Sequence, residues 1–156
     1  MNGFFNGAGT EAPAARVIAN VVFWPDIDTD HLQAALRLGD TVTPQRLDVA
    51  AIEAMQSVNQ ALATFRTGQE AAGFARADQI PGEEIDGQTL LIHRYRRAVY
   101  CRVGAELAER YRGSDTTSTG DSHADALTPS IDEYRRDANW AITDILGQSR
   151  STIELI

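Results

Sequence analysis

The stretch from Thr43 to Phe65 constrains the fold of this chain more than any other. Side chains spaced by three or four residues share one face of an α-helix, because each residue turns the helix by about 100°. Thr43 is a suitable N-cap, and Pro44 suits the first helical position, where a missing N–H costs nothing. The sequence therefore predicts a long amphipathic helix over 44–66, with room to continue through Glu70 before Gly73 breaks it. Its buried stripe is Leu47, Ala51, Met55, Val58, Leu62 and Phe65.

Two more long helices and one short helix are predicted from the same kind of pattern. A helix from about Gln88 to Arg112 has a wide apolar arc, which indicates packing on more than one side, within the fold or against another subunit. A later helix is expected to begin with Thr128 as cap and Pro129 at the first position, and to end at Gly147. A short helix over roughly 29–38 is capped by Asp28 or Asp30 and ends at Gly39.

The segments between and around these helices have weaker patterns. Residues 1–20 predict a flexible N-terminal arm, and the β-branched run at 21–24 predicts an extended segment that stops at Pro25. Residues 74–88 indicate a loop with a short turn, and the polar stretch 113–127 indicates a mobile loop. Residues 151–156 alternate apolar and polar side chains, as a strand does. We therefore expect a mainly α helical bundle over 21–156, a single domain with an N-terminal arm and a strand-like tail.

Composition excludes several classes of protein. The 156 residues include 22 Asp and Glu against 14 Lys and Arg, a net charge of −8, which argues against a protein that coats nucleic acid or an anionic membrane by net charge. All 14 basic residues are arginine, so a phosphate-binding loop with lysine is absent. The one cysteine, Cys101, permits no intrachain disulfide and fits a reducing compartment. No apolar run is long enough to span a membrane, and the N-terminus has no signal-peptide pattern.

The search for catalytic or metal-binding motifs is negative. Asp26, Asp28 and Asp30 are spaced like the start of a calcium loop, but glycine and glutamate are missing at its sixth and twelfth positions. The histidines lack metal-ligand spacing, and Cys101 is expected to be an inert thiol inside a helix. We therefore expect no enzyme, cofactor or metal. The alternative of an enzyme that uses the loop acids of 83–86 stays open.

The helix over 88–112 carries an unusual concentration of positive charge. Six of its residues are arginine and two are glutamate, and the arginines spread widely around the helix. Arg102 falls within the apolar arc, where a buried guanidinium needs a carboxylate, and Glu106 is the nearest in sequence. One interpretation is a partly buried ion pair. The other is a helix that contacts an acidic surface on a partner chain.

Several short stretches form a pattern when they are taken in order. They are Val22-Phe23-Trp24-Pro25-Asp26-Ile27-Asp28, Ala71-Ala72-Gly73-Phe74, Ile85-Asp86-Gly87, Glu109-Arg110-Tyr111-Arg112-Gly113, Ile131-Asp132-Glu133, Asp137 and Trp140-Ala141. This pattern resembles the gpL-type head completion (head stabilisation) proteins of tailed phages with contractile tails. The resemblance covers roughly residues 20–156 and brings no catalytic motif.

The resemblance implies a structural protein of the virion, at the junction of head and tail, assembled in the host cytoplasm. Such proteins join the portal vertex after DNA packaging, help to retain the genome and connect to neck or tail proteins. A ring of twelve copies around the passing DNA is expected, with no membrane partner. The alternative is a small helical nucleic-acid-binding or regulatory module. Candidate contacts with neighbouring subunits or the portal are Phe23, Trp24, Arg94, Arg97, Arg102, Tyr111, Ile153 and Leu155.

Overall fold

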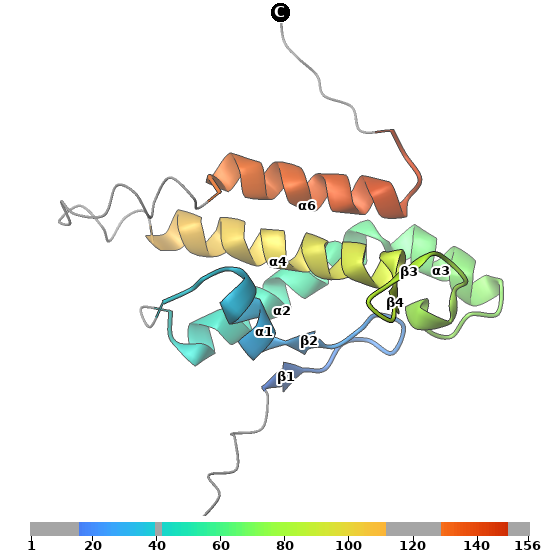
Figure 1. Ribbon diagram of the computed structural model, residues 1–156, viewed down its shortest axis with the longest axis horizontal. Helices are drawn as coiled ribbons and strands as arrows, with labels where there is room; N and C mark the ends of the chain where they lie inside the picture. Colours follow the sequence, from blue (N-terminus) through green and yellow to red (C-terminus); the bar gives the residue numbers. More distant parts are fainter. Residues whose placement is uncertain (1–15, 40–41, 112–128, 150–156) are drawn as a thin grey trace, which may run out of the picture.

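The computed structural model describes residues 16–39, 42–111 and 129–149, and these form a mainly α-helical fold, as the sequence predicts. Figure 1 shows α6 lying along α4 and running in the opposite direction, with α2 on another side of α4. The helices are α1 (Thr29–Ala35), α2 (Pro44–Ala61), α3 (Ala63–Ala71), η1 (Ala77–Gln79), α4 (Leu90–Tyr111) and α6 (Ile131–Ile145). The strands are β1 (Val17–Ile18), β2 (Ile27–Asp28), β3 (Glu84–Ile85) and β4 (Gln88–Thr89).

The long helix predicted over 44–66 is two helices. Thr43 caps α2 through its side-chain oxygen, as expected, but Leu62 departs from helical geometry (φ −100°, ψ 10°) and separates α2 from α3. The Leu62 side chain is fully buried. Beyond it, α3 ends as the sequence predicts, because Gly73 takes a positive φ of 99° and the Phe74 N–H donates to the Gln69 carbonyl at 3.0 Å.

Two expected helix boundaries are wrong, one by three residues and the other by two. The short helix α1 is capped by Asp28, but it ends at Ala35, and Arg37 rather than Gly39 takes the positive φ (54°) that closes it. An arginine in this conformation costs roughly 1–2 kcal/mol, because its Cβ crowds the following carbonyl. The cap of α6 is Ser130 rather than Thr128, and its Oγ accepts from the Glu133 N–H at 3.2 Å. Glu133 Oε2 accepts from the Ser130 N–H at 2.7 Å in return, which completes a capping box.

The strands lie in segments that the sequence predicts as arm or loop. Val17–Ile18 pairs with Ile27–Asp28, so residues 16–20 pack on the fold although they fall within the range expected as an arm. The expected extended segment 21–24 is wrong: it is a turn, closed by the Trp24 N–H donating to the Val21 carbonyl at 3.0 Å. The loop over 74–88 contains η1 and a hairpin, whose tight turn places Asp86 and Gly87 at positive φ. The strand-like pattern of 151–156 and the loop of 113–127 lie outside the described residues.

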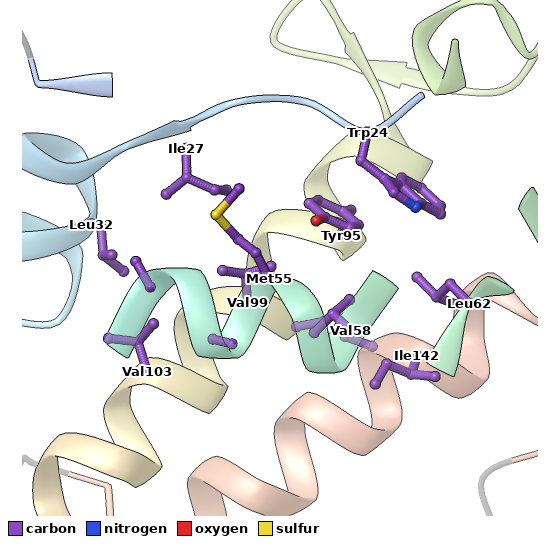
Figure 2. Packing of buried hydrophobic residues seen from close by; sticks show 14 of the residues in the cluster. Trp24, Ile27, Leu32, Met55, Val58, Leu62, Tyr95, Val99, Val103 and Ile142 are labelled. Atoms are coloured by element: carbon purple, nitrogen blue, oxygen red, sulfur yellow. The ribbon is translucent and has the colours of Figure 1, made fainter. Parts of the chain in front are cut away.

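Figure 2 shows Tyr95, Met55 and Val99 in the middle of the core, with Trp24 at one side of Tyr95. The Trp24 ring stacks on Tyr95, with centroids 4.6 Å apart, and on Phe65 at 6.2 Å. The wide apolar arc of α4 is therefore occupied within the protomer, by the N-terminal turn and α2 on one side and α6 on the other. Other fully or nearly fully buried members are Phe23, Ile27, Leu32, Leu47, Val58, Leu62, Val99 and Val103.

A closed ring of hydrogen bonds fastens the N-terminal turn to the helices. Asn20 Nδ2 donates to Tyr95 Oη at 2.7 Å, Tyr95 Oη donates to Asn59 Oδ1 at 2.7 Å, and Asn59 Nδ2 donates to Asn20 Oδ1 at 2.9 Å. Three segments far apart in the sequence thus satisfy each other's polar groups at a partly buried position. Burial raises the pKa of Tyr95 to about 12.

Alkaline pH should therefore weaken the fold through Tyr95. Because its pKa is about 12 in the folded chain and about 10 unfolded, its neutral form contributes stability below pH 10 that is lost as the pH rises toward 12. The full loss is roughly 2–3 kcal/mol, and about half of it is expected by pH 11. Tyr95→Phe should lower the free energy of unfolding at pH 7 by about 1–3 kcal/mol, since it leaves amide groups unpaired, and should remove this part of the pH dependence. Urea unfolding of both proteins at pH 7 to 11 measures the difference, and parallel pH profiles would contradict it.

Candidate interaction surface

Helix α4 presents its arginines to several sides of the molecule. Arg94 is half-buried, and within the described part of the chain it has no ion pair. Arg97 is exposed and donates to Asp137 Oδ2 on α6 at 3.3 Å. Arg96 donates to the side-chain oxygen of Gln88, a neutral acceptor. The positive charge of α4 is therefore only partly balanced by carboxylates.

The expected pairing of Arg102 with Glu106 is wrong. Glu106 Oε1 pairs instead with Arg110 Nη2 at 2.8 Å, on the more exposed side of α4. Arg102 is half-buried, and its Nε is enclosed without an acceptor among the described residues. The Arg110 side chain reaches Glu106 because residues four apart lie one turn above each other. Both arginines stand four residues from Glu106, but an acid that precedes a base by four residues pairs better than the reverse order, which favours Arg110.

Charged hollows lie on two sides of α4. A hollow of about 330 Å³ between α2, α4 and α6 is lined by Arg102 with Glu53, Glu106, Glu109 and Arg135. Within it, Arg135 Nη2 donates to Glu109 Oε2 at 2.8 Å. The second hollow is a groove of about 640 Å³ between α1, α4, the β3–β4 hairpin and the start of α6. Its charged and hydrogen-bonding side chains are His31, Arg37, Asp86, Gln88, His93, Arg96, Arg97, Tyr100, Cys101, Tyr134 and Asp137.

The remaining candidate contact residues fall into two groups. Phe23 and Trp24 are each only 2% exposed, so these two side chains form core and offer almost no surface to a second protein. Tyr111 closes α4, but its side chain lies outside what the structure describes, as do Ile153 and Leu155. Arg94 and Arg97 thus remain as candidate contacts with described side chains on the surface, together with the partly buried Arg102.

Of the groups that the sequence offers for chemistry, His31, His93, Asp86 and Cys101 line the 640 Å³ groove. Burial raises the pKa of the Cys101 thiol, which lowers its reactivity at neutral pH. Glu83, Glu84 and Asp86 are exposed on the hairpin. Among the described residues, no group of three or more histidine, cysteine or acidic side chains could hold a metal ion. In the same part of the chain, no helix is both long and apolar enough to cross a membrane.

Several members of the 640 Å³ groove could not be found from sequence. Arg37 and His31 come from α1 and its end, and Tyr100 comes from the middle of α4, where its Oη lies 2.7 Å from His31 Nδ1. Their proximity depends on the docking of α1 against α4, which involves residues 69 positions apart. The positive φ of Arg37 has no local sequence signal, since glycine or asparagine is usual there.

A mainly helical domain with charged hollows on two sides of its central helix is suited to contacts with other macromolecules. A model of the phage head completion protein (GPL) family matches residues 18–156. The chain is 40% identical over 140 residues to the head completion/stabilization protein of Escherichia phage P2, an alignment that covers 90% of this chain and 83% of that protein. No solved structure matches the chain. The chain therefore belongs to the phage head completion protein family, whose members are structural proteins of the virion.

Proposed function

We propose that this protein binds the portal vertex after DNA packaging, helps to retain the genome and connects the head to neck or tail proteins. The observation that carries the proposal is the 40% identity to the phage P2 head completion/stabilization protein over 90% of the chain. The family match over 18–156 adds that the resemblance spans every described helix. In this role the protein is not an enzyme, and it needs neither a cofactor nor a metal.

The portal contact is expected to involve a ring of copies, twelve in number, through which the DNA passes. Each contact in such a ring joins two different surfaces of the protomer, and the rotation between neighbours sets closure. The exposed Arg97 and the half-buried Arg94 are available for these contacts. Residues 21–156 would act as one connector domain, assembled on the head in the host cytoplasm.

Binding to heads tests the proposal directly. DNA-filled heads without tails, purified from a phage that lacks this gene, are mixed with the purified protein and sedimented. The proposal predicts that the protein co-sediments with these heads saturably and slows the release of their DNA. Empty proheads, whose portal has not taken the form present after packaging, should bind less protein. Equal binding to free duplex DNA at physiological salt would favour the nucleic-acid-binding alternative instead.

Removal of residues 151–156 should weaken assembly more than folding. The alternation of Ile153 and Leu155 with polar residues suits pairing with an edge of a neighbouring chain. Truncation is expected to reduce binding to heads and self-association about tenfold or more, while the helical circular dichroism per residue stays close to that of the full chain. Equal loss of helicity and binding would mean that the tail belongs to the core of the protomer.

A further inference from the structure

The groove of about 640 Å³ beside α4 holds arginines that the described part of the chain does not neutralise. Seven of the described arginines have a side-chain nitrogen within 4 Å of a carboxylate oxygen, but Arg37 and Arg96 are not among these seven. Arg37 is exposed and its guanidinium has no hydrogen bond to another described residue, while Arg96 donates to the neutral oxygen of Gln88. Both line this groove. In a chain with net charge −8, this is a site where positive charge is left available.

Neither carboxylate of the groove forms an ion pair with these two arginines. Asp137 is already engaged by Arg97 at 3.3 Å and by Arg136 at 3.0 Å. Asp86 lies on the hairpin turn, with no ion pair to any described residue. Two guanidinium groups that have no carboxylate partner among the described residues therefore face a concave surface.

The backbone conformation of Arg37 also supports a binding role for its side chain. Arg37 closes α1 with φ 54°, a conformation in which glycine or asparagine is favoured and arginine is strained. Nothing in the fold of α1 requires a long cationic side chain at this position. The arginine is therefore explained better by what it presents to the groove than by the helix that it ends.

The walls of the groove also offer apolar contact. Leu36 and Tyr100 are half-buried in it, close to Arg37 and Arg96 respectively in sequence. A ligand that fits has carboxylates for the two guanidinium groups and an apolar side chain between them. The phosphates of duplex DNA lie on the outside of a convex cylinder. They can therefore contact the rim of this groove more readily than its interior. A protein segment is therefore the better match.

We propose that this groove docks an acidic segment of a partner protein, with carboxylates bound by Arg37 and Arg96 and an apolar side chain against Leu36 and Tyr100. The proposal rests on the proposed function in one respect: the partner would be a neighbouring protein of the head–tail junction. It adds to the proposed function the surface that binds the partner, which is this groove, and the acidic and apolar character of the segment that is bound.

Fluorescence anisotropy with the full chain tests the docking site. The probe is a labelled, end-blocked peptide Gly-Glu-Leu-Glu-Gly, and its Gly-Gln-Leu-Gln-Gly counterpart is the matched control. We expect saturable binding of the acidic peptide, about tenfold weaker in Arg37→Gly and in Arg96→Gln and unchanged in Arg66→Gln on α3. Equal binding of both peptides, no saturable binding, or equal effects of all three substitutions would overturn the proposal. If a duplex oligonucleotide binds more tightly than the acidic peptide, and both arginine substitutions weaken its binding, the groove binds nucleic acid and the proposal is overturned.

Arg37→Gly separates binding from folding. Glycine adopts the positive φ of this position without strain, so the unfolding temperature of the variant should be no lower than that of the parent protein. A weakened peptide complex in a protein of undiminished stability assigns the loss to the missing guanidinium. A fall in unfolding temperature that matches the loss of binding would contradict the assignment.

A phage complementation assay distinguishes failure of the groove from failure of the proposed function. The double substitution Arg37→Gly with Arg96→Gln should reduce the yield of infectious particles while the protein stays folded. If these particles are normal but the gene remains essential for DNA retention, the protein is a head completion connector that docks through another surface. If the gene is dispensable for DNA retention, the proposed function fails, whatever the peptide result.

Discussion

Replacing Trp24 with alanine is expected to lower the free energy of unfolding by about 3–5 kcal/mol. The side chain is 2% exposed and stacks nearly parallel to Tyr95, with 10° between the rings and 4.6 Å between the centroids. It also stacks on Phe65 and meets Phe23 edge to face at 4.8 Å. The substitution would therefore leave a large cavity where the N-terminal turn joins the helices.

Urea unfolding measures this loss, and Val22→Ala is the matched control. Val22 is the neighbouring turn residue at 81% exposure, so its substitution should change stability by less than about 0.5 kcal/mol. The experiment also decides between a core role and a contact role for Trp24. If Trp24→Ala keeps its stability but fails to bind DNA-filled heads, Trp24 is a contact residue rather than the centre of the core.

Gly104→Ala should destabilise the protein by about 1–3 kcal/mol, although alanine is the better helix former. Gly104 lies where α4 and α6 approach closely, and a Cβ there would stand 2.7 Å from Cε1 and 2.8 Å from Cζ of Tyr134. Tyr134 is 8% exposed and lines the 640 Å³ groove, so its ring could relieve the overlap only by a shift toward that groove. The added methyl group must separate α4 from α6 or displace the ring.

Gly68→Ala is the control, with the opposite expected sign. Gly68 lies within α3, and a Cβ at this position would meet nothing within 4 Å, so alanine should raise stability by about 0.5–1 kcal/mol. A double-mutant cycle with Tyr134→Ala then tests the cause at Gly104, because removal of the ring should relieve most of the cost of the methyl group. Thermal unfolding of the parent protein, the two single variants and the double variant gives the coupling. Independent, additive effects would show that the close contact is not the source of the loss.

The periodic helices are the part of the fold that can be predicted from sequence. The stripe of α2, the length of α4 and the glycine that ends α3 all follow from local rules of spacing and capping. The break at Leu62 does not, because leucine is a good helix former and carries no local signal for the non-helical backbone that it adopts. The end of α1 at Arg37 escapes prediction for a similar reason, since Gly39 carries the stronger local signal.

Contacts between distant segments limit the prediction of the surface. The ring of Asn20, Asn59 and Tyr95 joins three elements, and the polar residues alone do not indicate which of them meet. The pairing of Glu106 with Arg110 follows the favourable order of an acid four residues before a base, whereas the enclosure of the Arg102 Nε depends on the docking of other elements on α4. The arginine-rich character of α4 is visible in the sequence, whereas the groove that combines it with Arg37 requires the docked position of α1.

Deleting this gene from the producing phage, followed by electron microscopy and a DNA-retention assay, tests the central claim most directly. A head completion connector predicts full-size heads that have packaged DNA, lose it on storage and carry no tail, with recovery when the gene is supplied from a plasmid. Infectious particles of normal morphology that retain their DNA would contradict a role at the portal vertex.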